Sequence, residues 1–566
     1  MRFDVRFWPL AFLLLGLACG SVAGADSAAG YGGDAGAAGP SSRGGGGSAC
    51  ASSSECPSGL TCLNGQCVTP SDQKPGETAS AVAGPPPAAT PNYVFALDPA
   101  GGQAIRITAA NLAIEAISLG GNPAEIDAFS TSDRVLVLNS GNNRLHLLDA
   151  TAGPTVRRDI LLDRRQNHLR LSLDATWAIC FTDPNTSPDQ GAEGIVTVVH
   201  LSTSAASAGT AFDRAAGYRV SDVFFRSVAG ATQGAVAVGL NTVSFFDLSQ
   251  GTVPDLPPRQ ALPASASADL ASRSVVATPD GAYVLIRSFT AQEITVIDVD
   301  AQTVTALPIP DIATDLEVEP GGTAAVVVMR ASAQVEVLHI PQDLGASGTP
   351  TVISLGAFNA GQIVISPVPD PSTGPFGLLF TNASPSMEIA RLELQRGTLI
   401  AYPDTLQKLV QGVGISPDGK TAIVVHRPDP NPSMTDPYAA QVAADQGYSM
   451  FDLRTASAQL KRTGKVQVQA FAFAPQGGVA AVALRDDKDL VYGVDVLDLS
   501  TLVASSLSLA SPPEYVGAVP QQVGTSTDPF AWVTQVYGGG RISFVDLKNL
   551  ALETVTGFEL NAQIQN

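Results

Sequence analysis

A short apolar strand that ends on an acidic residue is repeated along most of this chain. Copies include EITVIDVD at 293–300, TVSFFDLS at 242–249 and RISFVDLK at 541–548. The ends of the repeated strand fall at Asp149, His200, Asp247, Asp298, His339, Glu393, Asp452, Asp498 and Asp546. Successive ends are about 41 to 59 residues apart. A period of this length, built from short apolar strands, is typical of propeller blades.

Other features keep the same phase as this strand. Upstream lie two apolar strands joined by a turn, as in VVATPDGAYVLIR, VGISPDGKTAIVVHR, FAFAPQGGVAAVALR and LEVEPGGTAAVVVMR. Proline, aspartate and glycine favour a tight turn at this point. Downstream, a short polar link leads to a fourth strand, as in AQTVTALPIP. The acid is therefore expected to end the third strand of each blade, where its side chain accepts hydrogen bonds from backbone N–H groups.

These repeats predict an all-β fold over residues 92–566, namely a β-propeller of about ten four-stranded blades. The first unit, which contains QAIRITA at 103–109, has no recognisable opening strand, whereas NAQIQN at 561–566 is in phase with GNPAEIDAF at 121–129. N- and C-terminal strands are therefore expected to close the ring without a long exposed edge. Because ten blades exceed the usual number, a split blade or more than one sheet body is the alternative.

Residues 1–19 have the pattern of an export signal. Two arginines precede an apolar run at 7–17, which is shorter than a membrane-spanning helix. The segment resembles a bacterial lipoprotein signal, and this resemblance implies that Cys19 is lipidated and becomes the N-terminus. Ordinary secretory cleavage after Ala23 or Ala25 is the alternative.

Two segments of biased composition are expected to separate the signal from the propeller. Residues 20–49 are rich in glycine, alanine and serine, which predicts a flexible tether. Residues 68–91 contain three consecutive prolines, which favour an extended polyproline II linker.

Residues 50–67 contain Cys50, Cys56, Cys62 and Cys67. Four cysteines this close together in an exported chain predict two disulfides. Zinc binding is the alternative, which the absence of paired C-x-x-C spacings and of a nearby histidine disfavours. The pairing is open among three connectivities, of which Cys50–Cys62 with Cys56–Cys67 is preferred. The segment resembles small cysteine-rich modules of secreted and surface proteins.

The net charge of the chain argues against partners with a densely negative surface. The chain has 32 basic and 52 acidic residues, a formal net charge of −20. No basic surface is available to displace counterions from nucleic acid or to dock on anionic lipid. With the export signal, we expect a lipid-anchored protein of the outer membrane or cell surface, with the periplasm as the alternative.

No catalytic motif is recognisable in the sequence: G-x-S-x-G, P-loop and H-E-x-x-H are all absent. His168 and Arg170, in NHLRLS, begin an inner strand, where side chains line the central channel. They are the candidate ligand-contacting pair. His146, His200 and His339 lie in third strands and are expected to be structural, as is Cys180 in the apolar stretch WAICF.

Three long acidic loops are expected between second and third strands, at 182–194, 428–447 and 486–493. Blade geometry places these loops on one face of the ring. Their candidate ligands for Ca²⁺ or a basic partner are Asp183, Asp189, Asp429, Asp436, Asp486 and Asp487. No EF-hand spacing occurs, so solvated surface loops and no cofactor are the simpler interpretation.

The acid-terminated strands and the SPDGK turn at 416–420 resemble the bacterial YVTN-type and lactonase-like propellers, with WD40-like and TolB-like turns. The resemblance implies a fold rather than a function. With the export signal, the leading hypothesis is a cell-envelope lipoprotein whose propeller is a non-catalytic binding or scaffold surface for an envelope protein or polysaccharide. The alternative is a lactonase-like hydrolase or isomerase that acts at the mouth of the channel. Two or more carboxylates with a histidine at that mouth would favour the alternative.

Overall fold

The computed structural model describes residues 61–63, 66–68 and 87–557, the first two segments as backbone only. Short gaps within the described part fall at 130, 183, 185–193, 203–207, 268–269, 271–272, 289, 346–347, 359, 384, 403–405, 430–435, 520–527 and 538–539. The predicted signal, tether and most of the linker, together with the cysteine side chains of 50–67, lie outside these residues.

The chain divides into a smaller unit, Trp8–Val82, and a larger one that contains Ala83–Asn566. In the smaller unit, β1 (Thr61–Leu63) and β2 (Gln66–Val68) form an antiparallel pair in which Cys62 lies opposite Cys67. The disulfide pairing itself stays a prediction.

The described part of the larger unit contains ten antiparallel four-stranded sheets, each made of four consecutive strands. The first two blades are β3 (Ala88–Ala89), β4 (Tyr93–Asp98), β5 (Gln103–Thr108), β6 (Ile114–Ser118), and β7 (Pro123–Ala128), β8 (Arg134–Asn139), β9 (Arg144–Asp149), β10 (Val156–Leu161). The third and fourth are β11 (His168–Leu171), β12 (Trp177–Phe181), β13 (Ile195–Leu201), β14 (Gly209–Ala215), and β15 (Asp222–Val228), β16 (Ala231–Val238), β17 (Thr242–Asp247), β18 (Arg259–Ala261). The fifth is β19 (Arg273–Ala277), β20 (Tyr283–Ser288), β21 (Glu293–Asp298), β22 (Thr303–Pro308).

The second half of the chain repeats the same arrangement five times. The sixth and seventh blades are β23 (Asp315–Val318), β24 (Ala324–Met329), β25 (Gln334–His339), β26 (Thr351–Ser354), and β27 (Gln362–Ile365), β28 (Phe376–Phe380), β29 (Ile389–Glu393), β30 (Thr398–Tyr402). The eighth and ninth are β31 (Leu409–Ile415), β32 (Thr421–Arg427), β33 (Gln446–Asp452), β34 (Ser457–Gly464), and β35 (Gln467–Phe473), β36 (Val479–Asp486), β37 (Val491–Asp498), β38 (Val503–Ser508). The tenth is β39 (Pro513–Val519), β40 (Phe530–Gln535), β41 (Arg541–Asp546), β42 (Leu552–Thr556).

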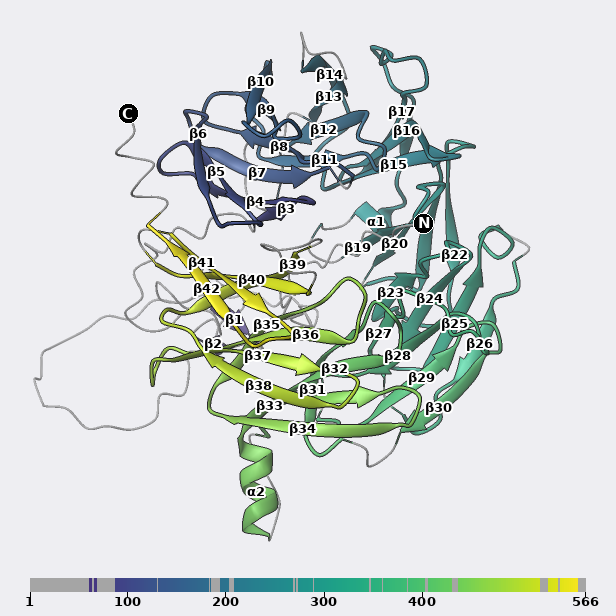
Figure 1. Ribbon diagram of the computed structural model, residues 1–566. Coiled ribbons are helices and arrows are strands. Elements are labelled where there is room, and N and C mark those ends of the chain that lie inside the picture. The colour runs from purple at the N-terminus through teal and green to yellow at the C-terminus, as the bar shows by residue number, and fades with distance from the viewer. Residues whose placement is uncertain are drawn as a thin grey trace, which may run out of the picture. The chain divides into compact units, whose positions relative to one another are not determined.

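The ten sheets are the blades of a β-propeller and are arranged in a ring, with the first strand of each blade innermost (Figure 1). The predicted fold class and the count of about ten units are confirmed. Every repeated acid or histidine named above belongs to the third strand of its blade, as the sequence pattern predicts.

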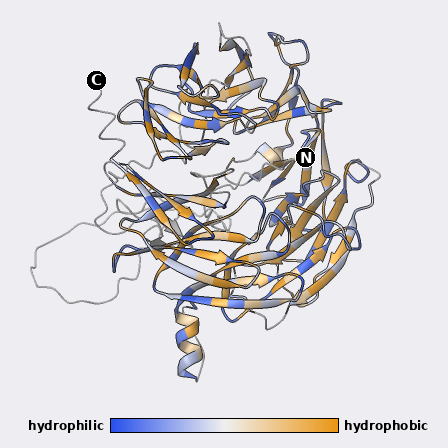
Figure 2. Cartoon of the chain, viewed as in Figure 1, coloured by the Kyte–Doolittle hydropathy of each residue, from blue (hydrophilic) through white to orange (hydrophobic). Residues whose placement is uncertain are grey.

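The apolar core lies between neighbouring blades. Second strands such as β24 and β28 are buried along their whole length, whereas the inner strands β7, β15 and β39 are partly exposed at most positions. Hydrophobic residues follow most of the strands, as Figure 2 shows. The partial exposure of the inner strands indicates that solvent reaches the inner edge of the blades.

The ring closes where the first and the last blades meet. One apolar cluster combines Val94 and Ile105 of the first blade with Trp532, Ile542 and Phe544 of the last. Burying apolar surface on both sheets supplies the free energy that holds this seam, as it does between the other blades.

The prediction that the first blade lacks an opening strand is wrong, because β3 fills that position. This strand is only two residues long and lies before the predicted start of the domain at residue 92. It follows Pro87, the last of three consecutive prolines, and proline offers no N–H to a strand ladder. The C-terminal segment 561–566 lies outside the described residues.

The direction of the strands defines two faces of the ring. Antiparallel strands alternate in direction, so that inner strands begin and second strands end at the same face, here called the mouth face. Neighbouring inner strands are aligned there: the backbone N–H of Ile363, near the start of β27, donates to Oδ2 of Asp315, which begins β23, over 2.9 Å.

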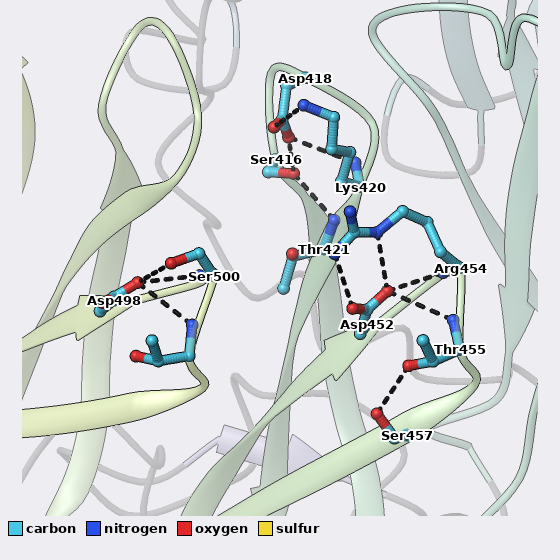
Figure 3. Close-up of polar contacts among 11 residues, drawn as sticks. Ser416, Asp418, Lys420, Thr421, Asp452, Arg454, Thr455, Ser457, Asp498 and Ser500 are labelled. Atoms are coloured by element: carbon cyan, nitrogen blue, oxygen red, sulfur yellow. Dashed lines mark hydrogen bonds and ion pairs between the residues drawn. The ribbon is translucent and has the colours of Figure 1, made fainter.

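The third-strand acids end at the opposite face and organise the turn that follows. Asp498 Oδ1 accepts hydrogen bonds from the backbone N–H groups of Ser500 (2.9 Å) and Thr501 (3.2 Å), and Asp452 accepts from that of Arg454 over 2.8 Å (Figure 3). Equivalent bonds to the following turn are made by Asp149, Asp247, Asp298 and Asp546. The predicted structural role of the repeated acid is confirmed at these positions.

The described residues contain two helices, α1 (Ala264–Ser267) and α2 (Pro437–Ala444). The second corrects the sequence prediction, which treated 428–447 as an irregular loop. Asp436 caps the helix by accepting a hydrogen bond from the backbone N–H of Tyr438 over 3.0 Å, and proline follows at the first helical position. Neither helix is long and apolar enough to cross a membrane.

Candidate functional site

The predicted pair His168 and Arg170 lies at the inner edge of the third blade and is joined by a carboxylate of the second. Nδ1 of His168 lies 2.9 Å from Oε2 of Glu125, and Nη1 of Arg170 lies 3.8 Å from Oε1 of the same residue. The backbone N–H of Leu169 also donates to Glu125. These three side chains, Glu125, His168 and Arg170, form what we call the mouth cluster.

The local strand pattern places these groups together. His168 and Arg170 alternate along β11 with Leu169 and Leu171, which pack in the apolar core between the second and third blades. The rings of His168 and Phe181 are nearly perpendicular, with 4.7 Å between their centroids. The side chains of the mouth cluster keep 22–28% of their surface exposed, so that a ligand in solvent can touch them.

A second carboxylate lies near this cluster. Asp222 begins β15 in the fourth blade, and Ser221 Oγ donates to its Oδ2 over 2.7 Å. Burial raises the pKa of Asp222, although the Ser221 hydroxyl and the positive charges of Arg273 and Arg170 act in the opposite direction. A raised pKa reduces the negative charge that Asp222 adds to the mouth.

Arg273 holds Ser221, the hydrogen-bond donor to Asp222, in place. The residue is buried, and its Nη2 donates to Ser221 Oγ over 2.8 Å and to the backbone carbonyl of Gly239 over 2.9 Å. Its Nη1 donates to the carbonyl of Ala266, in α1, over 3.0 Å. Arg273 therefore stabilises the connection between the fourth and fifth blades. Of these two arginines, Arg170 is the one that is exposed to solvent.

The arrangement of Glu125 and His168 fixes the chemistry that the imidazole offers. A carboxylate on Nδ1 favours the tautomer whose proton lies on Nδ1, so that Nε2 carries the lone pair. Among the described residues, no hydrogen bond reaches Nε2 of His168. The site thus presents an acceptor on His168 beside donors on Arg170, a combination that recognises hydroxyl groups and carbonyl oxygens.

The predicted acidic ligands do not converge within the described residues. Asp436 caps α2, Asp487 pairs with Arg485 at 2.7 Å, and Asp486 accepts from the backbone N–H of Lys488 over 3.0 Å. Asp429 donates its backbone N–H to the carbonyl of Ala443. Asp183 and Asp189 lie outside the described residues, and in the described part of the chain no group of three or more His, Cys, Asp or Glu is arranged to hold a metal ion.

The remaining histidines serve packing and hydrogen bonding. His146 is buried with its Nδ1 2.8 Å from Oδ1 of Asp159, and burial lowers its pKa. His200 stacks on Trp177 at 4.4 Å, and Nδ1 of His339 lies 2.7 Å from Oδ2 of Asp343. The structural roles predicted for these three histidines are thereby confirmed.

Cys180 is the buried core thiol that the sequence predicts. It is free and fully buried, and burial raises its pKa.

Two acidic members of the site were missed by reasoning from the sequence. Glu125 lies in GNPAEIDAF, where the repeat phase was visible but the partner in the next blade was not. Asp222 has the same position at the start of its inner strand as His168 has in the preceding blade. Charged residues at the start of successive inner strands are the signal that would have found both.

No protein-family model and no curated protein matches this chain. Among solved structures it is similar to a eukaryotic initiation factor (10% identity over 82% of this chain and 96% of that one, TM-score 0.47). It is also similar to the β-propeller domain of Cps50 (Swd1) from Myceliophteria thermophila (9% identity, 75% and 96% coverage, TM-score 0.33) and to Hsv2 from Kluyvelomyces marxianus (12%, 60% and 96%, TM-score 0.32). These likenesses concern the fold alone, and the ten four-stranded sheets of this chain themselves show a ten-bladed β-propeller.

Proposed function

We propose that this chain is a lipid-anchored protein of the bacterial cell envelope whose propeller binds an envelope polysaccharide at the mouth face without transforming it. The observation that carries the proposal is the mouth cluster, in which Glu125 orients His168 beside Arg170 at a solvent-reached inner edge. Sugar hydroxyls both donate and accept hydrogen bonds, and this cluster offers both kinds of partner. The alternative partner for this surface is an envelope protein.

Binding of soluble envelope polysaccharide to the purified full-length protein tests the proposal. We expect His168→Gln and Arg170→Gln to weaken binding at least tenfold, because each removes a group that touches the ligand. His339→Gln is the matched control, since His339 ends a third strand at the opposite face. Equal binding by all three variants and the wild type would place the contact elsewhere, and binding of an envelope protein alone would replace the polysaccharide.

A second candidate function is lactonase-like hydrolysis, and one observation favours it. The mouth holds the carboxylates of Glu125 and Asp222 with His168, and a histidine oriented by a carboxylate can act as a general base towards water. A panel of lactones tests this candidate. If the wild type hydrolyses one of them, His168→Gln does not, and no polysaccharide binds, then hydrolysis replaces polysaccharide binding as the preferred function.

The anchor is proposed from the export signal and has its own test. A Cys19→Ser variant is expected to lose lipid labelling and to leave the membrane fraction, because the thiol is the acylation site that the signal implies. Membrane association that persists in this variant without acylation would contradict the anchor and leave the propeller proposal intact.

A further inference from the structure

A second group of charged side chains lies at the mouth face, around the start of the sixth and seventh blades. Asp315 and Glu317 are two residues apart on one side of β23, whose other side packs Leu316 into the core. Nη2 of Arg287, from the fifth blade, lies 4.0 Å from Oδ1 of Asp315. Arg330, at the end of β24, is the fourth member; we call these residues the Arg330 cluster.

Arg330 has a defined position but no polar partner in the described part of the chain. Its Nε is buried without a hydrogen bond, and no described group accepts from the rest of its guanidinium. A Cβ built on Gly361 would lie 1.7 Å from its Nη2, so the guanidinium rests directly on the backbone of Gly361, just before inner strand β27. Burial lowers the pKa of Arg330, and the charge of Asp315 opposes that shift.

The carboxyl groups of Asp315 and Glu317 differ in how readily they lose their protons. Burial raises the pKa of both. Asp315 accepts backbone N–H bonds from Ile363 (2.9 Å) and Leu316 (3.0 Å), which favour its ionised form. The Asp315 charge then adds to burial at Glu317, whose pKa is raised to about 8, with Arg287 opposing the shift. The backbone N–H bonds therefore favour the negative charge of the pair on Asp315, and near neutral pH Glu317 keeps its proton.

The formal charge of the cluster follows from these states. Arg287 and Arg330 each contribute one positive charge and Asp315 one negative charge, so the cluster is positive by one in a chain whose net charge is −20. A monoanion would neutralise it, whereas a dianion such as sulfate would leave an uncompensated charge in a half-buried place. A guanidinium fork fits a carboxylate with two parallel hydrogen bonds, and a protonated carboxyl adds a donor.

We propose that Arg330, with the charge of Asp315 near it and Glu317 two residues further along β23, binds the carboxylate of a small acidic ligand at the mouth face between the sixth and seventh blades. The site shares no residue with the mouth cluster, so its failure would leave the proposed function standing. The elements packed against β23 are β19, β24 and β27. Their charged residues are Arg273, on the far side of the fifth blade, and Arg330, which follows β24; β27 has none.

Isothermal titration of the full-length protein with D-glucuronate, D-glucose and sulfate tests this site. We expect glucuronate to bind at pH 7 and neither of the other two to bind. Arg330→Gln should weaken glucuronate binding at least tenfold. Arg427→Gln is the matched control, because Arg427 occupies the equivalent position in the eighth blade. Ala324 and Thr421 each pair with the last residue of the third strand of their blade, and each arginine follows six residues later.

Two further variants separate ligand binding from folding. Gly361→Ala keeps Arg330 but pushes its guanidinium aside, and should lose glucuronate binding while the urea midpoint stays close to that of the wild type. Glu317→Gln keeps a donor but cannot ionise. Wild-type affinity should fall up to tenfold per pH unit above pH 8, and that of Glu317→Gln should not. No glucuronate binding, equal binding of sulfate, or an unchanged pH profile in Glu317→Gln would overturn the proposal.

Discussion

Buried histidine at position 426 makes the stability of the protein sensitive to mild acid. His426 is 1% exposed, its Nε2 lies 2.7 Å from Ser449 Oγ, and burial lowers its pKa to about 3. Between about pH 3 and 6.5 the unfolded chain binds a proton at this residue that the folded chain does not. Stability from this group is thus present above the unfolded pKa and is lost as the pH falls.

This linkage gives a measurable prediction. From pH 6.5 to pH 5, the free energy of unfolding of the wild type should fall by about 1.6 kcal/mol more than that of His426→Gln, because the slope approaches about 1.4 kcal/mol per pH unit only below the unfolded pKa. Urea denaturation at a series of pH values measures the difference. A His426→Gln variant as acid-sensitive as the wild type would show that His426 does not cause the dependence.

A second residue-scale prediction concerns the buried carboxylate of Asp495. It is fully buried, and Tyr448 of the preceding blade donates its hydroxyl to Oδ2 of Asp495 over 2.6 Å. Tyr448→Phe leaves this carboxylate without its donor and should lower the free energy of unfolding by about 1–3 kcal/mol. The double variant with Asp495→Leu should recover part of the loss, and a loss that persists unchanged there would assign the effect to packing.

At the scale of elements, the third strand carries a second polar position that the sequence analysis overlooked. Three residues before the terminal acid or histidine, eight of the blades place a buried polar side chain: His146, Thr197, Ser244, Thr295, Glu336, Ser449, Asp495 and Ser543. Several bond to a neighbouring strand, as Thr197 Oγ1 does to Asp213 Oδ1 over 2.7 Å. The repeat was readable in the sequence, but the different partners in each blade were not.

Helix α2 depends on one buried lysine. Lys408, in the link before β31, is fully buried, and its Nζ donates to the carbonyls of Val442 and of Ala443, the latter over 3.2 Å. Arg462 adds an ion pair to Asp445, just after the helix, at 2.6 Å. These contacts hold a helix that projects from the ring (Figure 1).

Lys408→Met should therefore release α2 without unfolding the blades. We expect amide hydrogen exchange over 437–444 to become at least tenfold faster, because the helix is too short to persist alone. Lys420→Met, at an exposed lysine in a turn of the opposite face, is the control and should leave exchange at α2 unchanged. Protection of 437–444 that survives in Lys408→Met would mean that other contacts suffice.

For the whole molecule, the sequence predicted the repeated blade but not the side-chain contacts between neighbouring blades. Strand order, blade number and the role of acids such as Asp498 follow from local patterns of apolar residues, turns and caps, which the sequence displays directly. The contacts of Glu125 with His168, and of Trp532 with the first blade, join residues far apart in the chain. Periodicity alone cannot specify such pairs, because it fixes where a strand begins and not which side chain of the next blade it meets.

The mouth face exists only because the ring is closed. If the first and tenth blades did not pack together, the inner strands would form an open arc, and the mouth cluster would lie along that arc rather than around an axis. The apolar cluster that contains both Ile105 and Phe544 is therefore the packing on which the account depends.

A double-mutant cycle across the seam tests this packing most directly. Ile105→Ala, Phe544→Ala and the combined variant are compared with the wild type by urea denaturation. Side chains that share a packed cluster should show a coupling free energy of about 0.5–3 kcal/mol. Effects that add to within about 0.5 kcal/mol would contradict the closed ten-bladed ring.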